Sequence, residues 1–116
     1  RLLLLVCILR ISHVDGADAR LPSAVLINLP RHQERFEGVK AQLESARVPF
    51  RRINAVDGKQ MSSADLRANV TALGRLLLTR GMIGCFLSHR RCWQECLTSN
   101  KPLLVFEDDV VLEPDF

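Results

Sequence analysis

The feature that most constrains this chain is an apolar run near its end that leads directly into a cluster of acids. The run extends from Leu103 to Phe106, and Glu107, Asp108 and Asp109 follow at once. An unbroken run of this kind is typical of a strand buried on both faces, as in a parallel sheet. Open α/β sheets bind their ligands outside the carboxyl ends of such strands. We therefore predict a ligand site where the acids stand.

The acidic cluster is a candidate site for a hard divalent cation. Like charges repel at short range, and Mg²⁺ or Mn²⁺ relieves that repulsion by binding carboxylate oxygens. Side chains alternate along a strand, so Glu107 and Asp109 are expected on one side and Asp108 on the other. We predict that Asp109 holds the metal with help from Glu107, while Asp108 is left for a ribose or a backbone amide. The alternative is a polar strand end with solvated acids.

The preceding sequence predicts two strand-then-helix steps. A buried strand at Ala24–Leu29 leads to an amphipathic helix at Gln33–Ala46. A second strand, Arg51–Val56, is closed by the turn pair Asp57 and Gly58, in which the glycine permits a positive φ. Two such steps before the acidic-ended strand predict a parallel sheet with right-handed crossovers.

The segment between the second and third strands carries signals for helix starts. Residues 62–65 form a capping box ahead of a short helix, Ser63 to about Val70. Thr71 to Leu78 is ambiguous, because a glycine interrupts it. Thr79 caps a longer helix from Arg80 to about Thr98. The residues expected on its inward face include Ile83, Phe86, Leu87, Trp93 and Leu97.

Composition limits both the size of the domain and its partners. A chain of 116 residues is at most one domain, and its net charge of +3 arises from 16 basic and 13 acidic residues mixed along it. This charge is too weak and too dispersed to form a nucleic-acid surface. Lys and Arg remain available for an anionic donor or an anionic membrane surface, so peripheral membrane association stays open.

Residues 1–20 are expected to lie outside the functional domain, which we place at residues 21–116. The apolar run Leu2–Leu9 is too short to span a bilayer as a helix, which takes about 20 residues. Residues 17–19 resemble a small-x-small cleavage site, so a signal-peptide remnant is one alternative. A membrane-associating stub and a stray strand are the others.

Three cysteines share the longer helix with one histidine. Cys85, His89, Cys92 and Cys96 recur at positions i, i+4, i+7 and i+11. The stripe is about 16 Å long at roughly 1.5 Å per residue, so one zinc ion with bonds near ~2.0–2.3 Å cannot reach all four. We predict small buried cysteines on an apolar helix face. No disulfide framework is indicated, which fits a reducing compartment.

Polar residues also follow the first two strands. Asn28 can hydrogen-bond a base or a ribose, and Arg31 and Arg35 can pair bidentately with a diphosphate. Asp57 and Gly58, at the end of the second strand, can meet a ribose hydroxyl. Each has an ordinary alternative, namely solvated arginines on an exposed helical turn and a plain turn pair.

The longer helix adds weaker candidates. Gly81 and Gly84 permit a close backbone approach to a ligand, whereas Ser88 and His89 lie mid-helix, where a histidine is usually a hydrogen-bonded structural residue. No Gly-rich phosphate loop, nucleophile elbow or HExxH motif is present in the sequence. We therefore nominate no catalytic residue from these patterns.

In this order and spacing, the pieces resemble glycosyltransferase family 25, the lipopolysaccharide-biosynthesis and procollagen-galactosyltransferase family. The resemblance runs from about Val25 to the C-terminus. The matching stretches are Val25–Leu29 with Arg31 and Arg35, Asn54–Gly58, Leu78–His89 and Phe106–Leu112.

The resemblance implies the N-terminal, donor-binding part of a GT-A fold, a Rossmann-like α/β three-layer sandwich with a mainly parallel sheet, truncated at its C-terminus. The acidic strand end then looks like a DxD-type element, in which Asp109 and Glu107 coordinate the Mn²⁺ or Mg²⁺ that bridges the diphosphate of a nucleotide sugar. The donor-binding residues that the resemblance implies are Asn28, Arg31, Arg35, Asp57, Gly58, Gly84, Ser88, His89 and Asp108.

The activity implied is transfer of a hexose, galactose or glucose, from a UDP-sugar to a saccharide, lipid-linked saccharide or hydroxylysine-type acceptor in lipopolysaccharide or glycan biosynthesis. The catalytic base is expected outside these residues, so the chain alone need not be active. The alternatives are a non-catalytic nucleotide- or sugar-binding fragment and a Mg²⁺-dependent phosphohydrolase. The expected location is the cytoplasm, at the inner face of the membrane, or the ER lumen if the N-terminal run is a signal remnant.

Overall fold

The structure is a computed structural model that describes residues 22–113. The predictions for residues 1–20, including the apolar run, lie outside the described residues. None of the helices within residues 22–113 is long and apolar enough to cross a lipid bilayer. The elements, in chain order, are β1 (Ser23–Asn28), α1 (Gln33–Ser45), β2 (Phe50–Asn54), α2 (Ser63–Asn69), α3 (Ala72–Leu77), α4 (Arg80–Ser99) and β3 (Leu103–Glu107).

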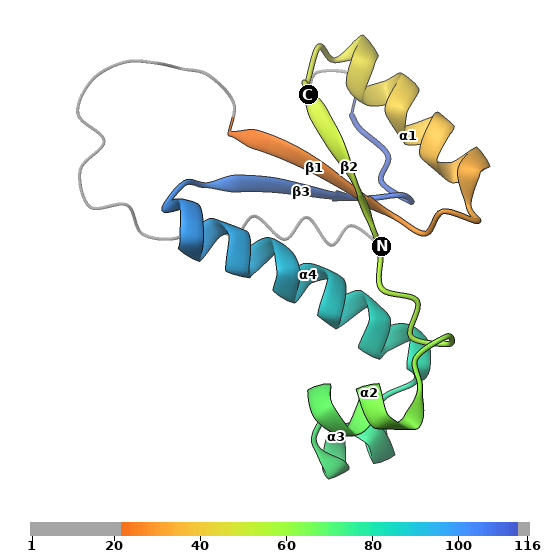
Figure 1. Cartoon of the computed structure of the whole chain (residues 1–116). Coiled ribbons are helices and arrows are strands. Elements are labelled where there is room, and N and C mark those ends of the chain that lie inside the picture. Colours follow the sequence, from red (N-terminus) through yellow and green to blue (C-terminus); the bar gives the residue numbers. More distant parts are fainter. Residues whose placement is uncertain (1–21, 114–116) are drawn as a thin grey trace.

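The described strands form one parallel sheet with β1 in the middle, in the order β2-β1-β3. In this register Ala24 of β1 pairs with Phe50 of β2 and with Leu104 of β3. Helix α1 lies over one face of the sheet and α4 over the other, so the fold has three layers (Figure 1). The predicted parallel sheet in a three-layer α/β architecture is confirmed for residues 22–113.

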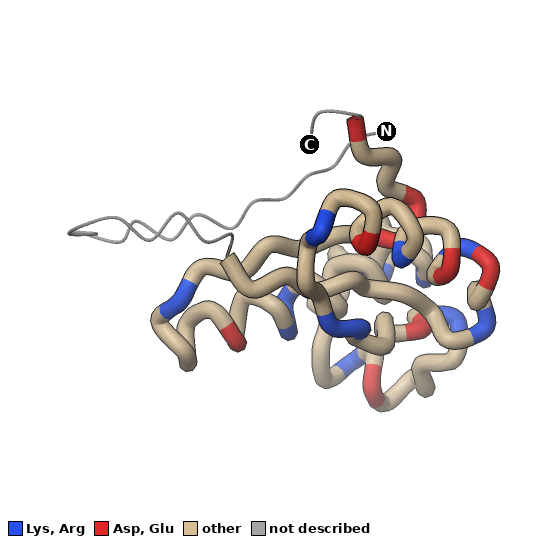
Figure 2. The backbone as a smooth tube through the Cα atoms, turned by 90° about the horizontal axis from the view of Figure 1, so that it is seen from above, with Lys and Arg blue, Asp and Glu red and all other residues tan. Residues whose placement is uncertain are grey.

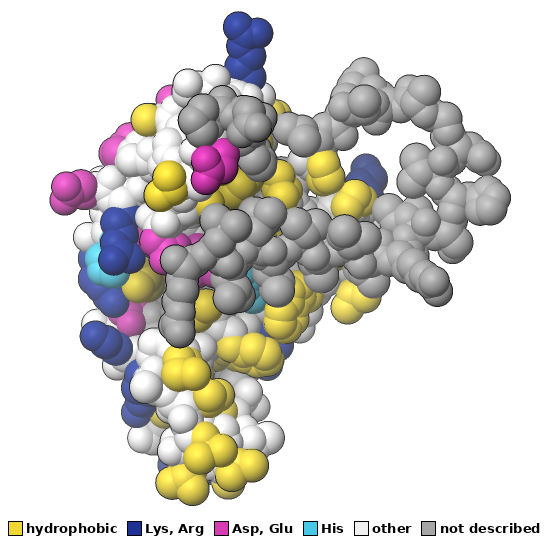
Figure 3. Space-filling model, turned by 180° about the vertical axis from the view of Figure 1, so that it is seen from behind, with side chains coloured by type: hydrophobic (Ala, Val, Ile, Leu, Met, Phe, Trp, Pro, Cys, Tyr) yellow, Lys and Arg dark blue, Asp and Glu magenta, His cyan; other side chains and the backbone are white. Residues whose placement is uncertain are grey.

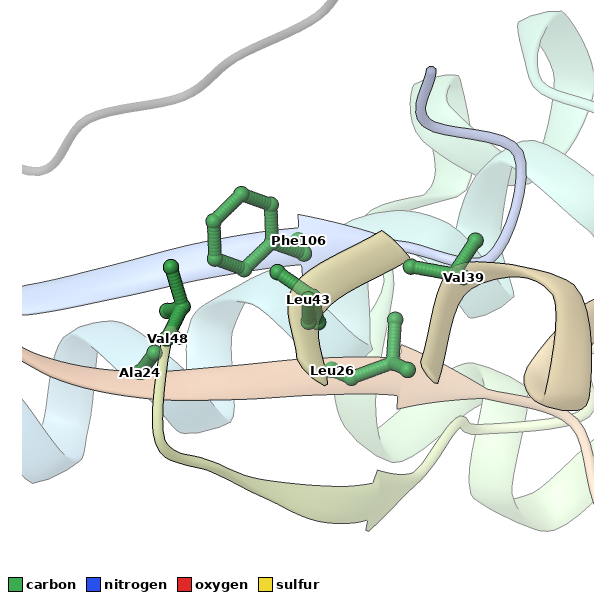
Figure 4. Packing of buried hydrophobic residues seen from close by; sticks show 6 residues of the cluster. All are labelled: Ala24, Leu26, Val39, Leu43, Val48 and Phe106. Atoms are coloured by element: carbon green, nitrogen blue, oxygen red, sulfur yellow. The ribbon is translucent and has the colours of Figure 1, made fainter. Parts of the chain in front are cut away.

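The face of the sheet under α1 carries an aliphatic core. Because successive side chains of a strand point to opposite faces, Ala24 and Leu26 of β1 lie on this side together with Phe106 of β3. They pack against Val39 and Leu43 of α1 (Figure 4). All of these residues are at most 4% exposed. Burying one side chain such as Leu or Phe contributes about 1.5–3 kcal/mol, so this cluster holds α1 on the sheet.

The opposite face of the sheet meets small residues of α4. Cys92 and Cys96 are fully buried against a set of strand residues that includes Val25 and Ile27. The prediction of buried cysteines is confirmed for these two. It is wrong for Cys85, which is exposed, because this part of α4 lies at the carboxyl edge of the sheet, beyond its apolar face.

The predicted inward face of α4 is only partly right. Ile83 and Leu87 are buried, but Phe86 and Leu97 are 48% and 67% exposed. Phe86 packs instead edge-on against Trp93, with the ring centroids 5.8 Å apart. Small and polar residues occupy much of the inward stripe, which lets the helix come close to the sheet and to the loop after β2. These residues are Gly84, Ser88, His89, Cys92 and Cys96.

Two short helices precede α4, and each begins at a side-chain cap. In α2 the Ser62 hydroxyl accepts from the Asp65 N–H at 3.1 Å, and the Asp65 carboxylate accepts from the Ser62 N–H at 3.3 Å. This reciprocal pair confirms the predicted capping box. The segment predicted as ambiguous contains α3, where the Thr71 hydroxyl accepts from the Gly74 N–H at 3.1 Å. Figure 3 shows hydrophobic side chains gathered at this end of the molecule, and the exposed leucines of α3 are Leu73, Leu76 and Leu77.

Helix α4 and the loop after β2 meet backbone to backbone. A Cβ on Gly84 would lie 2.4 Å from the Val56 carbonyl oxygen and 2.7 Å from the nitrogen of Gly58. The buried Ser88 hydroxyl accepts from the Val56 N–H at 2.8 Å and donates to the Gly84 carbonyl at 2.7 Å. Gly58 is closed in by the backbone of Arg80, and its φ lies outside the left-handed region. The turn does not use the positive φ that a glycine permits, and lack of space for a side chain accounts for the glycine.

Replacing Gly84 by alanine should destabilise the protein. We expect Gly84→Ala to lower the free energy of unfolding by about 1–3 kcal/mol, because the added methyl group meets backbone atoms on both sides. Gly38→Ala is the matched control, since a Cβ at this α1 position has open space. Removing that helix-interior glycine should raise the free energy of unfolding by about 0.5–1 kcal/mol. Urea titration measures both, and effects of equal sign and size would contradict the packing argument.

Candidate functional site

The carboxyl edge of the sheet carries a crevice where the strand order changes direction. From β1 the chain runs to β2 on one side, and it later returns to β3 on the other side of β1. Ligands of open α/β sheets bind at such a switch point. A cavity of about 290 Å³ opens there, and its lining includes the last residues of β1 and β3.

Most of the predicted site residues line this cavity. They are Asn28, Arg31, Arg35, Asp57, Gly58, Ser88, His89, Glu107 and Asp108. Gly84 is not among the lining residues, because its close approach is to the protein backbone. Asp109 is also outside the lining and stands exposed in the turn after β3. The assignment of these residues to a donor or a metal remains a prediction.

Asn28 is the polar junction of the cavity wall. It is 1% exposed, and its Nδ2 donates to the Asp108 carboxylate at 2.6 Å and to the His32 carbonyl at 3.0 Å. Its Oδ1 accepts a hydrogen bond from the Arg52 guanidinium. The buried amide is thus satisfied at both ends. Because the protein occupies both N–H donors of Asn28, only a lone pair on Oδ1 remains for a ligand.

The two arginines predicted to bind a diphosphate are each paired with an acid. Arg31 pairs with Asp57, and the Arg35 guanidinium lies 3.5 Å from the Asp108 carboxylate. The hydrogen bond from Arg31 is the main cause that holds the pKa of Asp57 below its usual value, and the Lys59 N–H lowers it further. A guanidinium has five N–H donors, so each arginine keeps donors for an anion.

Opposite charges are balanced in the cavity lining. Along the described backbone, basic and acidic positions are interspersed (Figure 2). Three basic side chains face three acidic ones in the lining, so with neutral histidines its formal charge is zero. These residues are Arg31, Arg35 and Lys59, and Asp57, Glu107 and Asp108.

Glu107, the last residue of β3, faces α4. One carboxylate oxygen lies 3.1 Å from Nε2 of the buried His89, and the other lies 4.0 Å from Sγ of Cys85. A carboxylate only accepts hydrogen bonds, so Nε2 carries the proton in this contact. Partial burial raises the pKa of the Cys85 thiol, and the negative charges of Glu107 and Asp109 raise it further. Both carboxylates therefore act on this thiol.

Glu107 and Asp109 fit a hard cation by donor type. Carboxylate oxygens are the ligands that Mg²⁺ and Mn²⁺ prefer. Neither residue is paired with an arginine or lysine in the described part of the chain, whereas Asp108 is engaged by Asn28 and Arg35. A cation would therefore not have to displace a guanidinium or an ammonium group from these two carboxylates.

Sequence reasoning missed Arg52 and Cys85 as parts of the site. The Arg52 guanidinium stacks 4.1 Å from the centroid of the Phe36 ring and donates to Asn28. Its signal was a charged side chain inside a predicted strand, which needs a partner wherever the strand is covered. The contact of Cys85 with Glu107 joins residues 22 positions apart, and no local pattern predicts it.

An open parallel α/β sheet with a polar crevice at its switch point is the frame of a Rossmann-like nucleotide-binding domain. A sequence model of glycosyltransferase family 25 (LPS biosynthesis protein) matches residues 22–116, and the chain belongs to this family. The resemblance inferred from the motifs is thereby confirmed. The three-layer α/β architecture agrees with the GT-A-type fold that the resemblance implies.

The relatives carry names that differ on activity. The chain is 36% identical over 100 residues to human procollagen galactosyltransferase 2, covering 78% of this chain and 16% of that protein. It is 38% identical over 101 residues to human inactive glycosyltransferase 25 family member 3, covering 78% and 17%. A glycosyltransferase 25 family member of Anopheles gambiae is 33% identical over 115 residues, covering 91% and 19%. The chain thus spans less than a fifth of the length of each of these relatives.

Removing the Arg31 guanidinium should raise the pKa of Asp57 toward its ordinary value of 3.8. Because the folded pKa lies below the unfolded one, the stabilisation is fully present above the unfolded pKa and is lost as the pH falls through the folded pKa. We expect Arg31→Gln to shift the Asp57 carboxyl titration upward in carbon NMR and to flatten the dependence of stability on acid pH. Arg35→Gln, which removes the partner of Asp108 instead, should leave Asp57 unchanged. An Asp57 that titrates identically in Arg31→Gln would refute the pairing.

Proposed function

We propose that this chain forms the donor-binding part of a glycosyltransferase that moves a hexose, galactose or glucose, from a UDP-sugar to a saccharide or lipid-linked saccharide in lipopolysaccharide or glycan biosynthesis. The observation that carries the proposal is the crevice at the switch point, with acids and arginines on its wall. Family membership supports glycosyl transfer, and the likeness to human procollagen galactosyltransferase 2 supports a galactosyl donor.

In this proposal the crevice recognises the donor by complementary charge. The lining is formally neutral, and a nucleotide-sugar diphosphate together with one divalent cation is also close to neutral. Arg31 and Arg35 bind the diphosphate with the N–H donors that Asp57 and Asp108 leave free. The ion pairs hold both guanidiniums beforehand, so less side-chain entropy is lost on binding. A ribose hydroxyl donates to one of the same carboxylates.

Glu107 and Asp109 would hold the Mn²⁺ or Mg²⁺. A cation bound there offsets the negative charge that builds on a departing diphosphate. His89 orients Glu107 through the 3.1 Å contact of its Nε2. Ser88 and Gly84 contribute indirectly, because they keep the loop after β2 packed against α4. We assign no catalytic base within residues 22–113.

We also propose a reducing compartment, the cytoplasm at the inner face of a membrane. In the part of the chain that the structure describes, Cys85 and Cys92 are free thiols. Free thiols are typical of reducing compartments. A location in the ER lumen is the alternative, and it would follow if residues 1–20 belong to a signal peptide.

A second candidate is a donor-binding module without transferase activity. One relative is named inactive, and the chain spans only 16% of human procollagen galactosyltransferase 2. Both candidates require metal-dependent donor binding, so they differ in whether the whole protein, assayed beyond this chain, consumes UDP-galactose in the presence of an acceptor. A Mg²⁺-dependent phosphohydrolase would instead release phosphate from phosphoesters with no acceptor present.

Asp109→Ala should abolish metal-dependent donor binding and leave the fold intact. Asp109 is exposed, so its removal costs little stability, yet it deletes a predicted metal ligand. We would titrate the purified chain calorimetrically with UDP and UDP-galactose, first with Mn²⁺ and then with EDTA. The wild type should bind UDP and UDP-galactose with Mn²⁺ and lose this binding with EDTA. Asp109→Ala should bind neither nucleotide under either condition. Glu44→Gln, which removes an exposed acid of α1 outside the cavity lining, should bind like the wild type.

Two outcomes would count against these assignments. Unchanged Mn²⁺-dependent UDP binding in Asp109→Ala would remove Asp109 from the metal site. Absence of binding by a wild-type chain that circular dichroism shows to be folded would contradict the proposal that this chain carries the donor site.

A further inference from the structure

Two residues of the cysteine and histidine stripe on α4 lie close to a third possible metal ligand from β3. Cys85 and His89 are four residues apart and share one helix face, and Glu107 at the end of β3 stands opposite them. One possible ligand atom from each of the three residues lies within 4.8 Å of the other two. We propose that Cys85, His89 and Glu107 form a three-residue binding site for Zn²⁺.

The distances in this cluster are close to those that a zinc ion imposes. With Zn–N and Zn–O bonds near ~2.0–2.2 Å and Zn–S bonds near ~2.3 Å, tetrahedral ligand atoms lie roughly 3.3–3.7 Å apart. The distance from Nε2 of His89 to the Glu107 carboxylate is 3.1 Å, and that from Sγ of Cys85 to the same carboxylate is 4.0 Å. Cys85 is exposed and Glu107 is half-buried, so both side chains have room to rotate toward a common ion.

The donor set selects a borderline-soft cation. Thiolate and imidazole favour Zn²⁺, whereas Mg²⁺ and Mn²⁺ favour sites made of oxygen alone. All three residues line the cavity, so a fourth coordination position would face its interior, as in zinc sites that keep one position open. The nearby charge of Asp109, which acts on the Cys85 thiol, further favours a cation over a neutral ligand.

The rest of the stripe is excluded from this site by its burial. Cys92 and Cys96 are 0% exposed and pack against the sheet. His89 is 6% exposed, and its Nδ1 has no hydrogen-bond partner among the described residues. Among the described residues the ring is therefore hydrogen-bonded through Nε2 alone, so no other hydrogen bond to them breaks when Nε2 turns from the carboxylate to an ion.

The proposal of a zinc site does not rest on the proposed function, although the zinc site and the donor site would share Glu107. Zinc bound to Glu107 would occupy one of the two carboxylates assigned to the hard cation. Zinc should therefore weaken Mn²⁺-dependent UDP binding, and this consequence alone rests on the proposed function.

A cobalt titration tests the three ligands directly. Co²⁺ replaces Zn²⁺ in such sites, and its thiolate complexes absorb strongly in the near ultraviolet, whereas its carboxylate complexes do not. We expect the folded wild-type chain to develop this absorption with one equivalent of Co²⁺ and to lose it when Zn²⁺ is added. Cys85→Ser should lose the band and bind zinc at least about tenfold more weakly, since even outer partners of a metal site contribute about 10–100-fold. His89→Gln and Glu107→Gln should weaken zinc binding by a similar factor.

Two control variants preserve the three ligands. Cys92→Ala removes a buried thiol of the same helix, and His32→Gln removes a histidine that lines the cavity outside the cluster. Both should keep the band and the zinc affinity, with circular dichroism establishing that each variant is folded. A band or a zinc affinity that survives Cys85→Ser would overturn the proposal, as would a folded wild-type chain with no cobalt band. If a chain free of Co²⁺ and Zn²⁺ fails to bind UDP with Mn²⁺, while the same chain develops the cobalt band when Co²⁺ is added, only the proposed function is overturned.

Discussion

The crevice depends on one buried amide. Asn28 ends the central strand just before the chain turns into α1, and its side chain joins groups that three other parts of the fold bring there. Its Nδ2 bonds the Asp108 carboxylate after β3 and the His32 carbonyl before α1, and its Oδ1 accepts from Arg52 of β2. A buried donor or acceptor without a partner costs about 1–3 kcal/mol, so these bonds favour one relative placement of the three strands. The wall of the cavity is therefore set from the centre of the sheet.

Helix α4 forms one side of the cavity, and its position depends on a residue without a side chain, Gly84. Gly84 lets α4 touch the backbone of the loop after β2. The Ser88 hydroxyl accepts a hydrogen bond from the Val56 N–H across this contact and donates one to the Gly84 carbonyl within α4. Together they fix the rotation of α4 about its own axis. The residues that follow each of them, Cys85 and His89, are then turned together toward Glu107. The packing of small residues thus decides which polar side chains of α4 meet the acidic end of β3.

Sequence patterns predicted the features that depend on residues close together in the chain. These are the alternation along the strands, the cap at Ser62 and the order of the elements. The polar strand ends could also be named from sequence, because the carboxyl ends of parallel strands share one edge. Their partners could not, since Asn28 and Asp108 lie 80 positions apart. Periodicity failed at Phe86 and Leu97 for another reason. It shows which residues share a helix face but not which face meets the sheet, and here the sheet side required small residues rather than the most hydrophobic ones.

The pairing of charges explains how one neutral crevice can offer separate places to a cation and an anion. Asp57 and Asp108 are each offset by an arginine, so the negative charge left to attract a cation is concentrated at Glu107, against α4. The arginines follow β1 and keep spare donors, so an anion is attracted to a different part of the wall. A hard and a soft cation differ in the further ligand each prefers, either Asp109 or the pair of Cys85 and His89. In the two proposals both cations take Glu107, so this carboxylate would be the residue through which metal identity controls donor binding.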